Sequence, residues 1–238
     1  MNTKTLAKSD FKEFSFVQKS NLKIIWGKIS LTAKKYLVFF LLICVVGFQK
    51  NSFQKVFNGK NFEGWEGDVN SVWNIQDGAL VGGNLTETVP HNYFLCMTKS
   101  YTDFHLKLKF KLENANGFAN AGVQFRSQRL NNPPHEMTGY QADIGDGFWG
   151  SLYDESRRDK VMAKADSSII KKYVKPNDWN EYEIIAQKNH IIIKMNGYTT
   201  VDYLEKDLEI PQKGLIGLQV HGGGKTKIWY KDILIKRL

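Results

Sequence analysis

Cysteine and proline are both scarce in this chain, which has two cysteines and five prolines among 238 residues. So few prolines, with 42% hydrophobic and 13% aromatic residues, exclude a disordered chain and favour a folded one rich in strands. Cys44 lies in an apolar N-terminal segment, so the folded part would hold Cys96 alone and no internal disulfide. We expect Cys96 to be a buried apolar residue and not a nucleophile.

Several catalytic signatures are also missing: there is no GxSxG, HExxH or GxxxxGK[ST] motif. The glycines at 222–224 have no strand-to-helix context, so they do not predict a phosphate loop. A divalent metal remains possible through His135, Glu136, Asp143 or His221, but no pair of them has the spacing that identifies a metal site.

A surplus of positive charge is absent from most of the chain, although the net charge is +9. Residues 1–50 hold nine lysines against Asp10 and Glu13, whereas residues 51–238 hold 24 basic and 22 acidic groups. A protein that binds nucleic acid needs a basic face to displace counterions from phosphates. This distribution therefore excludes nucleic acid as a partner.

No apolar run reaches the ~20 residues of a membrane-spanning helix. The longest, residues 36–48, has thirteen and follows Lys34 and Lys35. That length is typical of a signal-peptide core, so residues 1–50 are interpreted as a leader and the protein as exported, whether periplasmic, secreted or at the cell surface. The alternative is an uncleaved anchor, which would be the only contact with the membrane.

Alternating apolar and polar residues recur through the rest of the chain and are clearest at 104–112, where apolar positions alternate with His105 and three lysines. Asp77-Gly78 and Asn196-Gly197 are typical of two-residue hairpin turns. Further strands are predicted at residues 71–75, 79–82, 121–126, 140–144, 181–187, 190–196, 199–203, 215–220 and 227–236.

These strands predict an all-β fold, an antiparallel β-sandwich or jelly roll formed by a single domain over residues 53–238. No stretch of ten residues keeps a helical period, and residues 155–165 would form a short helix at most. Residues 145–172 are predicted to be a long loop, and a loop of that length with aromatic and arginine residues is usually functional.

Residues 135–158 concentrate acids, bases, amides and aromatic side chains. On a strand at 140–144, Gln141 and Asp143 share one face, and the same alternation pairs Gln124 with Arg126 and Gln219 with His221. If the three strands are adjacent, these side chains line one sheet face. Trp149 and Tyr153 would then lie above it, giving the hydrogen-bonding groups and stacking rings that sugars require.

Each of these residues also has a structural interpretation. Arg126 and Asp143 would form a buried ion pair, and Gln141 and Gln219 would satisfy backbone groups. Arg157 or Arg158 would cap Asp154 or Glu155 at the surface. Of the five histidines, His105 and His190 are expected to be inert, whereas His91, His135 and His221 stay open.

The chain from Val56 to Leu238 resembles the 3-keto-disaccharide hydrolase family. The matching segments are residues 57–65, 73–78, 121–126, 139–145, 150–153, 178–182, 195–197 and 217–222. The resemblance implies a concanavalin A-like lectin and glucanase fold, and cleavage of glycosides that already carry a ketone at C3. Where the family commonly has Glu-Val-Gln, this chain has Gln141-Ala142-Asp143.

A C3 ketone acidifies the C2 proton, so removing it creates an enolate that expels the C1 substituent, with a hydrolase or a lyase outcome. We hypothesise His221 or Asp143 as the base, Arg126 with Arg157 or a divalent metal as the enolate stabiliser, and Glu155 as the acid. The substrate, an oligosaccharide or glycoside, would be bound by Gln124, Tyr140, Gln141, Trp149, Tyr153, Asp154, Arg158, Gln219, His135 and Glu136. The alternatives are a non-catalytic carbohydrate-binding module and a structural or adhesion domain.

Overall fold

The computed structural model describes residues 52–69 and 71–238. The predicted leader, with its apolar segment, lies outside the described residues and stays a prediction. In the part of the chain that is described, no helix has the length and apolarity needed to cross a membrane.

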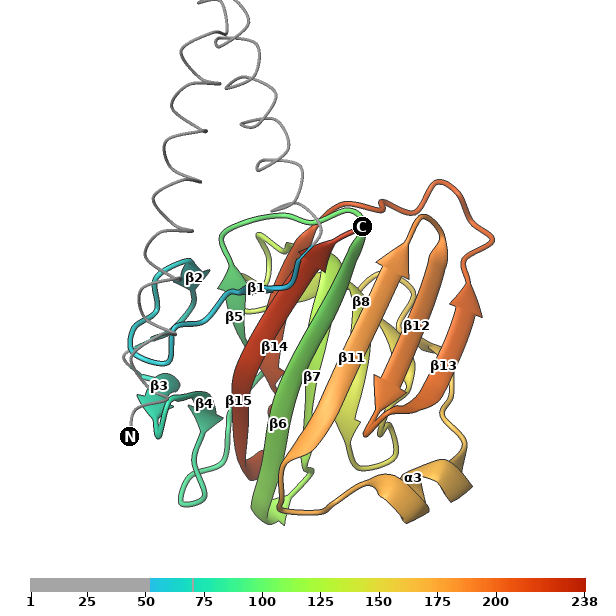
Figure 1. The fold of residues 1–238 in the computed structure, drawn as a ribbon. Helices are drawn as coiled ribbons and strands as arrows, with labels where there is room; N and C mark the ends of the chain where they lie inside the picture. Colours follow the sequence, from blue (N-terminus) through green and yellow to red (C-terminus); the bar gives the residue numbers. More distant parts are fainter. Residues whose placement is uncertain (1–51, 70) are drawn as a thin grey trace, which may run out of the picture. The chain divides into compact units, whose positions relative to one another are not determined.

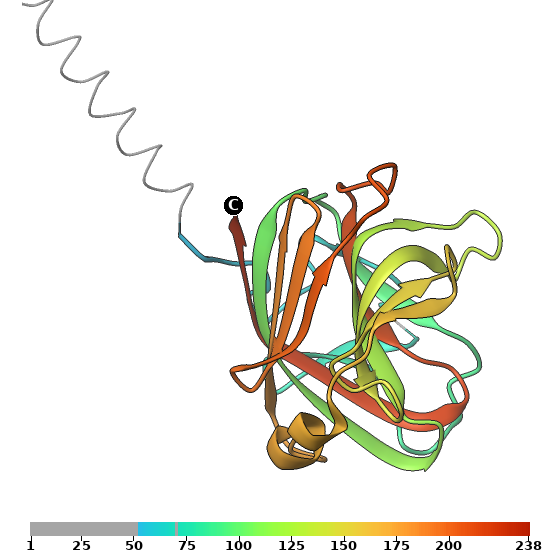
Figure 2. The same cartoon turned by 90° about the vertical axis from the view of Figure 1, so that its right-hand side faces the viewer.

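Two antiparallel sheets form the two layers of a sandwich (Figures 1 and 2). The first sheet runs in the order β13 (Tyr198–Leu204), β12 (His190–Met195), β11 (Asn180–Gln187), β6 (Phe104–Gly117), β15 (Gly224–Arg237), β4 (Ala79–Gly83) and β3 (Trp73–Gln76), with β1 (Gln54–Lys55) also paired to β15. The second runs in the order β10 (Lys160–Ala163), β9 (Leu152–Glu155), β8 (Met137–Gly145), β7 (Asn120–Arg129), β14 (Leu215–Val220), β5 (Tyr93–Met97) and β2 (Trp65–Glu66). The predicted all-β antiparallel sandwich is confirmed.

The hairpin turns form as their sequences predict. Asp77 and Gly78 have φ of 49° and 71°, and Asn196 and Gly197 have φ of 51° and 84°. Two consecutive positive φ angles match the right-handed twist of the flanking strands, and Asn-Gly or Asp-Gly adopts them at little steric cost. These turns fix the register of β3 with β4 and of β12 with β13.

The expectation for residues 145–172 is wrong. Strands β9 and β10 pair as a hairpin inside this segment, and no helix forms at residues 155–165. The sequence does not show the alternation of a strand at β9, because the carboxylate of Asp154 occupies an inward position where an apolar residue is expected. Among the described residues the one helix is α3 (Ser167–Tyr173), which Asp166 caps and which has no buried residue, so it carries no apolar stripe to predict it.

The inner faces of the two sheets form one hydrophobic core. On β6 the buried residues alternate with half-exposed ones, and on β7 Ala121, Val123 and Phe125 face the same core. Phe125 stacks on Tyr140 of β8, with 5.6 Å between ring centroids. Apolar burial of this kind is the main stabilising term of such a sandwich.

Two tyrosines of the first sheet cross this core and hydrogen-bond to the backbone of the second sheet. The Tyr182 hydroxyl donates to the carbonyl of Asp143 at 2.8 Å, and the Tyr230 hydroxyl lies 3.0 Å and 2.9 Å from the carbonyls of Gly122 and Gln219. Burial raises the pKa of both phenols well above the ordinary value, so they remain protonated donors. These bonds hold three adjacent strands of the second sheet in place.

We predict that Tyr230→Phe lowers the free energy of unfolding by about 1–3 kcal/mol, because it removes the buried donor and keeps the ring. Urea unfolding measures the change. Tyr198→Phe is the control, since that side chain is 43% exposed, and its stability should change by less than about 0.5 kcal/mol. Equal stabilities for the two variants would contradict this role for Tyr230.

Candidate functional site

The outer face of the second sheet carries a row of polar residues. Gln124 on β7 pairs with Gln141 on β8, and Gly122 lies opposite both Asp143 on β8 and Gln219 on β14. Because opposite residues in an antiparallel pair point to the same side, the side chains of these residues share the face away from the core. The shared face is the one that the alternation in the sequence predicts.

Hydrogen bonds link part of this row into a chain. The Ser127 hydroxyl donates to Gln124 Oε1 at 2.6 Å, and Gln124 Nε2 donates to Gln141 Oε1 at 3.2 Å. Gln141 Nε2 then donates to Asp143 Oδ1 at 2.9 Å. Gly122 leaves room for this arrangement, because a Cβ at that position would lie 2.6 Å from Gln141 Cδ. The chain fixes the orientation of the Gln141 amide and of the Asp143 carboxyl.

A pocket of about 220 Å³ opens above the end of this chain. Residues of β7, β8 and β9 line it. The turn between β8 and β9, the segment before β7 and the segment after β14 each add a residue. Its lining residues are Phe118, Asn120, Gln141, Asp143, Phe148, Tyr153, Glu155 and His221.

Two carboxyl groups of the pocket bind protons more tightly than usual. Burial raises the pKa of Asp143 well above its ordinary value, and hydrogen bonds from Gln141 and Asn120 oppose this rise only in part. The pKa of Glu155 is raised to about 7, mainly by burial and secondly by the nearby carboxylate of Glu136. The pocket therefore holds acids that can keep their protons near neutral pH.

His221 supplies a base on the other side of the pocket. Its Nδ1 lies 2.6 Å from the carbonyl oxygen of Gly222, which can only accept, so we assign the proton to Nδ1. That tautomer leaves Nε2 as a free acceptor. The Phe118 ring packs edge-on against the imidazole, with 5.1 Å between centroids, and so limits its rotation.

A bridge of two loops covers the outer face beside this pocket. The ring of His135 stacks on that of His91 at a centroid distance of 4.0 Å, and Asn92 Nδ2 donates to Glu136 Oε1 at 2.9 Å. Asn92 Oδ1 also accepts from the backbone N–H of Gly222 at 3.1 Å, next to His221. The bridge thus joins the segment before β5 to the segment before β8.

Comparison with known proteins identifies the family. The model of the 3-keto-alpha-glucoside-1,2-lyase-like domain matches residues 52–236. The chain belongs to this family. Membership indicates a carbohydrate-active, glycosidase-like protein, and the family resemblance in the sequence is confirmed. No curated protein matches the chain.

Solved structures similar to this family member support the same fold. A candidate glycosyl hydrolase from Parabacteroides distasonis has 22% identity over 78% of this chain and 94% of its own, with a TM-score of 0.57. The carbohydrate-binding module CBM66 from Bacillus subtilis has 16% identity over 73% and 95%, and a TM-score of 0.57. A Bacillus subtilis protein with a galectin-like fold has 12% identity over 78% and 94%, also with a TM-score of 0.57. At these identities the likeness concerns the fold, and it agrees with the predicted concanavalin A-like sandwich.

The structure brings five of the predicted site residues into the pocket: Gln141, Asp143, Tyr153, Glu155 and His221. Gln124 and Gln219 lie on the predicted face but are fully buried beneath its surface. Sequence reasoning missed Phe118, Asn120 and Phe148. Asn120 could have been found, because extending the strand by one residue puts it on the same face as Gly122 and Gln124; the other two lie outside the strands and gave no such signal.

Two predicted positions are wrong. Arg126 has φ of 50° at a bulge in β7, which turns its side chain off the polar face. Its guanidinium instead binds Asp103 Oδ1 at 3.1 Å and the carbonyls of Thr102 and Lys188 at 3.0 Å and 2.6 Å. Trp149 does not lie above the pocket either.

Trp149 packs on the core side, with its ring 6.2 Å from that of Phe110. The turn that begins at Gly145 directs Phe148, not Trp149, into the pocket. The stacking surface predicted for Trp149 therefore belongs to its neighbour.

Four more predicted residues form a separate buried network: Tyr140, Asp154, Arg157 and Arg158. They do not line the pocket because Tyr140 and Asp154 pair across β8 and β9 and face inward. Arg157 Nε donates to Asp154 Oδ1 at 2.9 Å, and Arg158 binds both Asp154 and Glu205, the latter at 2.8 Å. This network is closest to the structural interpretation of the arginines, although Asp154 is buried and not at the surface.

Glu205, which follows β13, receives two strong hydrogen bonds in this network. Burial by itself would raise its pKa, but the bonds from Arg158 and from the Tyr140 hydroxyl, at 2.5 Å, hold the pKa at about 2. The ionised carboxylate therefore ties β8 and β9 to the first sheet.

Within residues 52–69 and 71–238, no group of three or more His, Cys, Asp or Glu residues is placed to hold a metal ion.

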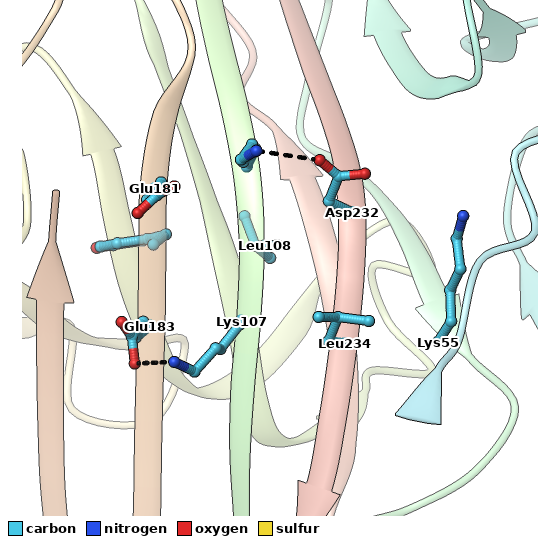
Figure 3. Close-up of a pocket in the computed structure, with 9 residues that line it drawn as sticks. Lys55, Lys107, Leu108, Glu181, Glu183, Asp232 and Leu234 are labelled. Atoms are coloured by element: carbon cyan, nitrogen blue, oxygen red, sulfur yellow. Dashed lines mark ion pairs between the residues drawn. The ribbon is translucent and has the colours of Figure 1, made fainter. Parts of the chain in front are cut away.

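A larger hollow, of about 480 Å³, lies on the outer face of the first sheet (Figure 3). Four of its charged side chains form two ion pairs: Lys107 with Glu183 at 3.1 Å and Lys109 with Asp232 at 3.3 Å. The side chains in these pairs are about 20–50% exposed. Such exposed pairs are typical of a solvated sheet face, so the smaller pocket of the second sheet is the candidate site.

The low pKa of Glu205 predicts an acid-sensitive contribution to stability. Its folded pKa is about 2, below the ordinary 4.5, so this contribution is present above pH 4.5 and is lost as the pH falls toward 2. Glu205→Gln should lose about 1–3 kcal/mol at pH 7 and show a flatter decline of stability below pH 4.5. Denaturant unfolding across this range measures both effects. Glu181→Gln, which removes an exposed carboxylate, should keep the wild-type slope, and a wild-type slope in Glu205→Gln would contradict the assignment.

Proposed function

We propose that this protein cleaves 3-keto glycosides by removing the C2 proton and eliminating the C1 substituent. The observation that carries the proposal is the convergence of His221, Asp143 and Glu155 in one pocket, with aromatic rings beside them. The family to which the chain belongs supports the choice of a C3-oxidised glucoside as substrate.

His221 is the proposed base. Its Nε2 has a free lone pair, whereas the raised pKa of Asp143 favours the protonated carboxyl, which cannot take up the C2 proton. The C2–H bond breaks as Nε2 takes the proton, and the electron pair moves into the C2–C3 bond and onto the C3 oxygen. Of the two candidate bases that the sequence leaves open, the geometry favours the histidine.

Asp143 is the proposed stabiliser of the enolate oxygen. A neutral carboxylic acid in a dry site donates a strong hydrogen bond to developing negative charge. Gln141 Nε2 donates to Oδ1, and Asn120 also hydrogen-bonds to the carboxyl. We place the carboxyl proton on Oδ2, from which it is donated to the substrate. The sequence hypothesis gave this role to Arg126 with Arg157 or a metal, but both arginines are engaged elsewhere.

Glu155 is the proposed acid. As the enolate collapses, the C1–O bond breaks and the departing oxygen takes the Glu155 proton. The sugar product is an enone, to which water can add, so both the lyase and the hydrolase outcomes follow from the same first step. A pKa of about 7 keeps much of Glu155 protonated at neutral pH.

The alternative is a non-catalytic carbohydrate-binding site, which the rings of Phe118, Phe148 and Tyr153 favour. Incubation with methyl 3-keto-α-glucoside distinguishes the enzyme from the binding site. If the protein is the enzyme, the wild type should release methanol, and His221→Ala should release it at least 100-fold more slowly. Bound but unchanged substrate would contradict the enzyme and leave the binding site. If neither binding nor cleavage occurs, and His221→Ala behaves as wild type, a structural or adhesion domain remains.

Replacing the proposed acid should have an effect that depends on the leaving group. Glu155→Gln should slow release of a sugar or alkyl group by about 10²–10⁴-fold, because these oxygens need a proton. A 4-nitrophenyl group leaves as the anion, so its release should fall by less than about tenfold. The wild-type rate with a sugar leaving group should also fall above pH 7, where Glu155 loses its proton, and the variant should lack this limb.

Glu181→Gln on the opposite sheet is the matched control and should leave both rates unchanged. A loss in Glu155→Gln that is the same for both leaving groups would contradict the acid role.

A further inference from the structure

The side-chain amide of Asn92 lies outside the set of residues that line the pocket and uses both of its ends. Its Nδ2 donates to Glu136 Oε1 at 2.9 Å, and its Oδ1 accepts from the backbone N–H of Gly222 at 3.1 Å. Asn92 precedes β5, Glu136 precedes β8 and Gly222 follows β14. One amide thus connects three segments of the chain next to His221.

The partners of Asn92 determine the orientation of its amide. A carboxylate accepts hydrogen bonds, whereas a backbone N–H only donates them. With Glu136 on one side and the Gly222 N–H on the other, Nδ2 has to face Glu136 and Oδ1 has to face Gly222. A rotated amide would place its oxygen against the carboxylate and its N–H against the Gly222 N–H, and both bonds would be lost. Glu136 therefore holds Asn92 in the orientation that binds Gly222.

Gly222 in turn controls the tautomer of His221, because its carbonyl oxygen lies 2.6 Å from His221 Nδ1. A glycine backbone is the least restricted by its own residue, so contacts from outside have to fix it. Glycine is nevertheless needed at this position, since a Cβ there would lie 2.7 Å from the Cα of His91. The base of the proposed reaction is thus oriented by a flexible residue that requires support.

Two peptide groups flank Gly222, and each forms a hydrogen bond with the segment before β5. The group that carries the Gly222 carbonyl is held by the Gly223 N–H, which donates to the carbonyl of Val89 at 2.8 Å. The group between His221 and Gly222 is held by Asn92. Loss of the Asn92 bond would free one of the two groups, so the direction of the carbonyl toward His221 would no longer be fixed.

We propose that Asn92 is a positioning residue that, together with Glu136, holds Gly222 so that His221 keeps its proton on Nδ1 and presents Nε2 to the substrate. This rests on the proposed function, in which His221 removes the C2 proton. A catalytic base commonly needs a further group to orient it, and here that group is a backbone carbonyl held by a side chain. Glu136, predicted from the sequence to bind substrate, acts through Asn92 in this arrangement.

Asn92→Asp in the full-length protein tests the proposal. The new carboxylate can still accept from Gly222, but it cannot donate to Glu136 and is repelled by it. We expect kcat for methyl 3-keto-α-glucoside to fall by about 10–100-fold, because the base is misplaced. KM should stay within about threefold of the wild type, because Asn92 lies outside the pocket lining.

Adding Glu136→Gln to Asn92→Asp exchanges the amide and the carboxylate. The new amide at position 136 can donate to the new carboxylate at position 92, which also accepts from the Gly222 N–H. We expect kcat to recover at least about fivefold over Asn92→Asp. Each protein is compared at its own optimum pH, because the charge of Glu136 affects the pKa of Glu155.

The tautomer of His221 is a readout that a purely structural role would not change. In protein labelled with ¹⁵N-histidine, at alkaline pH, nitrogen chemical shifts should show wild-type His221 protonated at Nδ1. Asn92→Asp should populate the tautomer protonated at Nε2, and the double variant should restore the wild-type shifts. Loss of one signal in His221→Ala identifies the residue.

Asn189→Asp is the matched control, because it removes another asparagine donor, the one that binds the carbonyl of Glu205 at 2.9 Å. It should leave kcat and the His221 tautomer unchanged. An unchanged tautomer in Asn92→Asp, a loss that Glu136→Gln does not reverse, or an equal loss in Asn189→Asp would overturn the proposal.

Failure of the proposed function would look different, because the wild type would then release no methanol from methyl 3-keto-α-glucoside. The tautomer measurement needs no substrate and would still test the contact. A changed tautomer in Asn92→Asp alone would support the positioning of His221 by Asn92, and the wild-type tautomer in that variant would overturn it.

Discussion

Hydrogen bonds from two tyrosines across the core link the stability of this sandwich to the geometry of its pocket. Tyr182 and Tyr230 donate to backbone carbonyls of Asp143, Gly122 and Gln219 from inside the core. The side chains on the opposite face of those same strands form the polar row. Because a strand alternates its sides, fixing the backbone from the apolar side also fixes where Gln141, Asp143 and His221 point.

The polar row is stable only because the inner faces are apolar. Burial raises the pKa of Asp143 and leaves the Gln219 amide without a hydrogen-bond partner among the described residues, and at neutral pH both conditions oppose folding. The core beneath, from Phe104 and Phe110 across to Phe125 and Tyr140, compensates for this. Functional sites commonly carry such local penalties, which a well-packed scaffold offsets.

Much of the fold and part of the site could be predicted from the sequence, because strand alternation is a local property. It put Gln141 and Asp143 on one side of their strand, and it predicted that Gln124 and Gln219 would share that face if the three strands were adjacent, which they are. It failed at Arg126, where one bulge reverses the direction of the side chain. A bulge depends on pairing with a distant strand and leaves no signal in the residues themselves. The direction of Trp149 and Phe148 likewise depends on a turn, where alternation does not apply.

Asp154 and Glu155 illustrate why residue type could not assign the roles. They are adjacent carboxylates on β9, but alternation sends Asp154 inward to two arginines and Glu155 outward to the pocket. The first has its charge matched by partners. The second has other carboxylates nearby and holds its proton to about pH 7. Two carboxyl groups one position apart on a strand thus have opposite properties, because they point to opposite sides of the sheet. Glu155, which has no arginine partner, is the one that can donate a proton to a substrate.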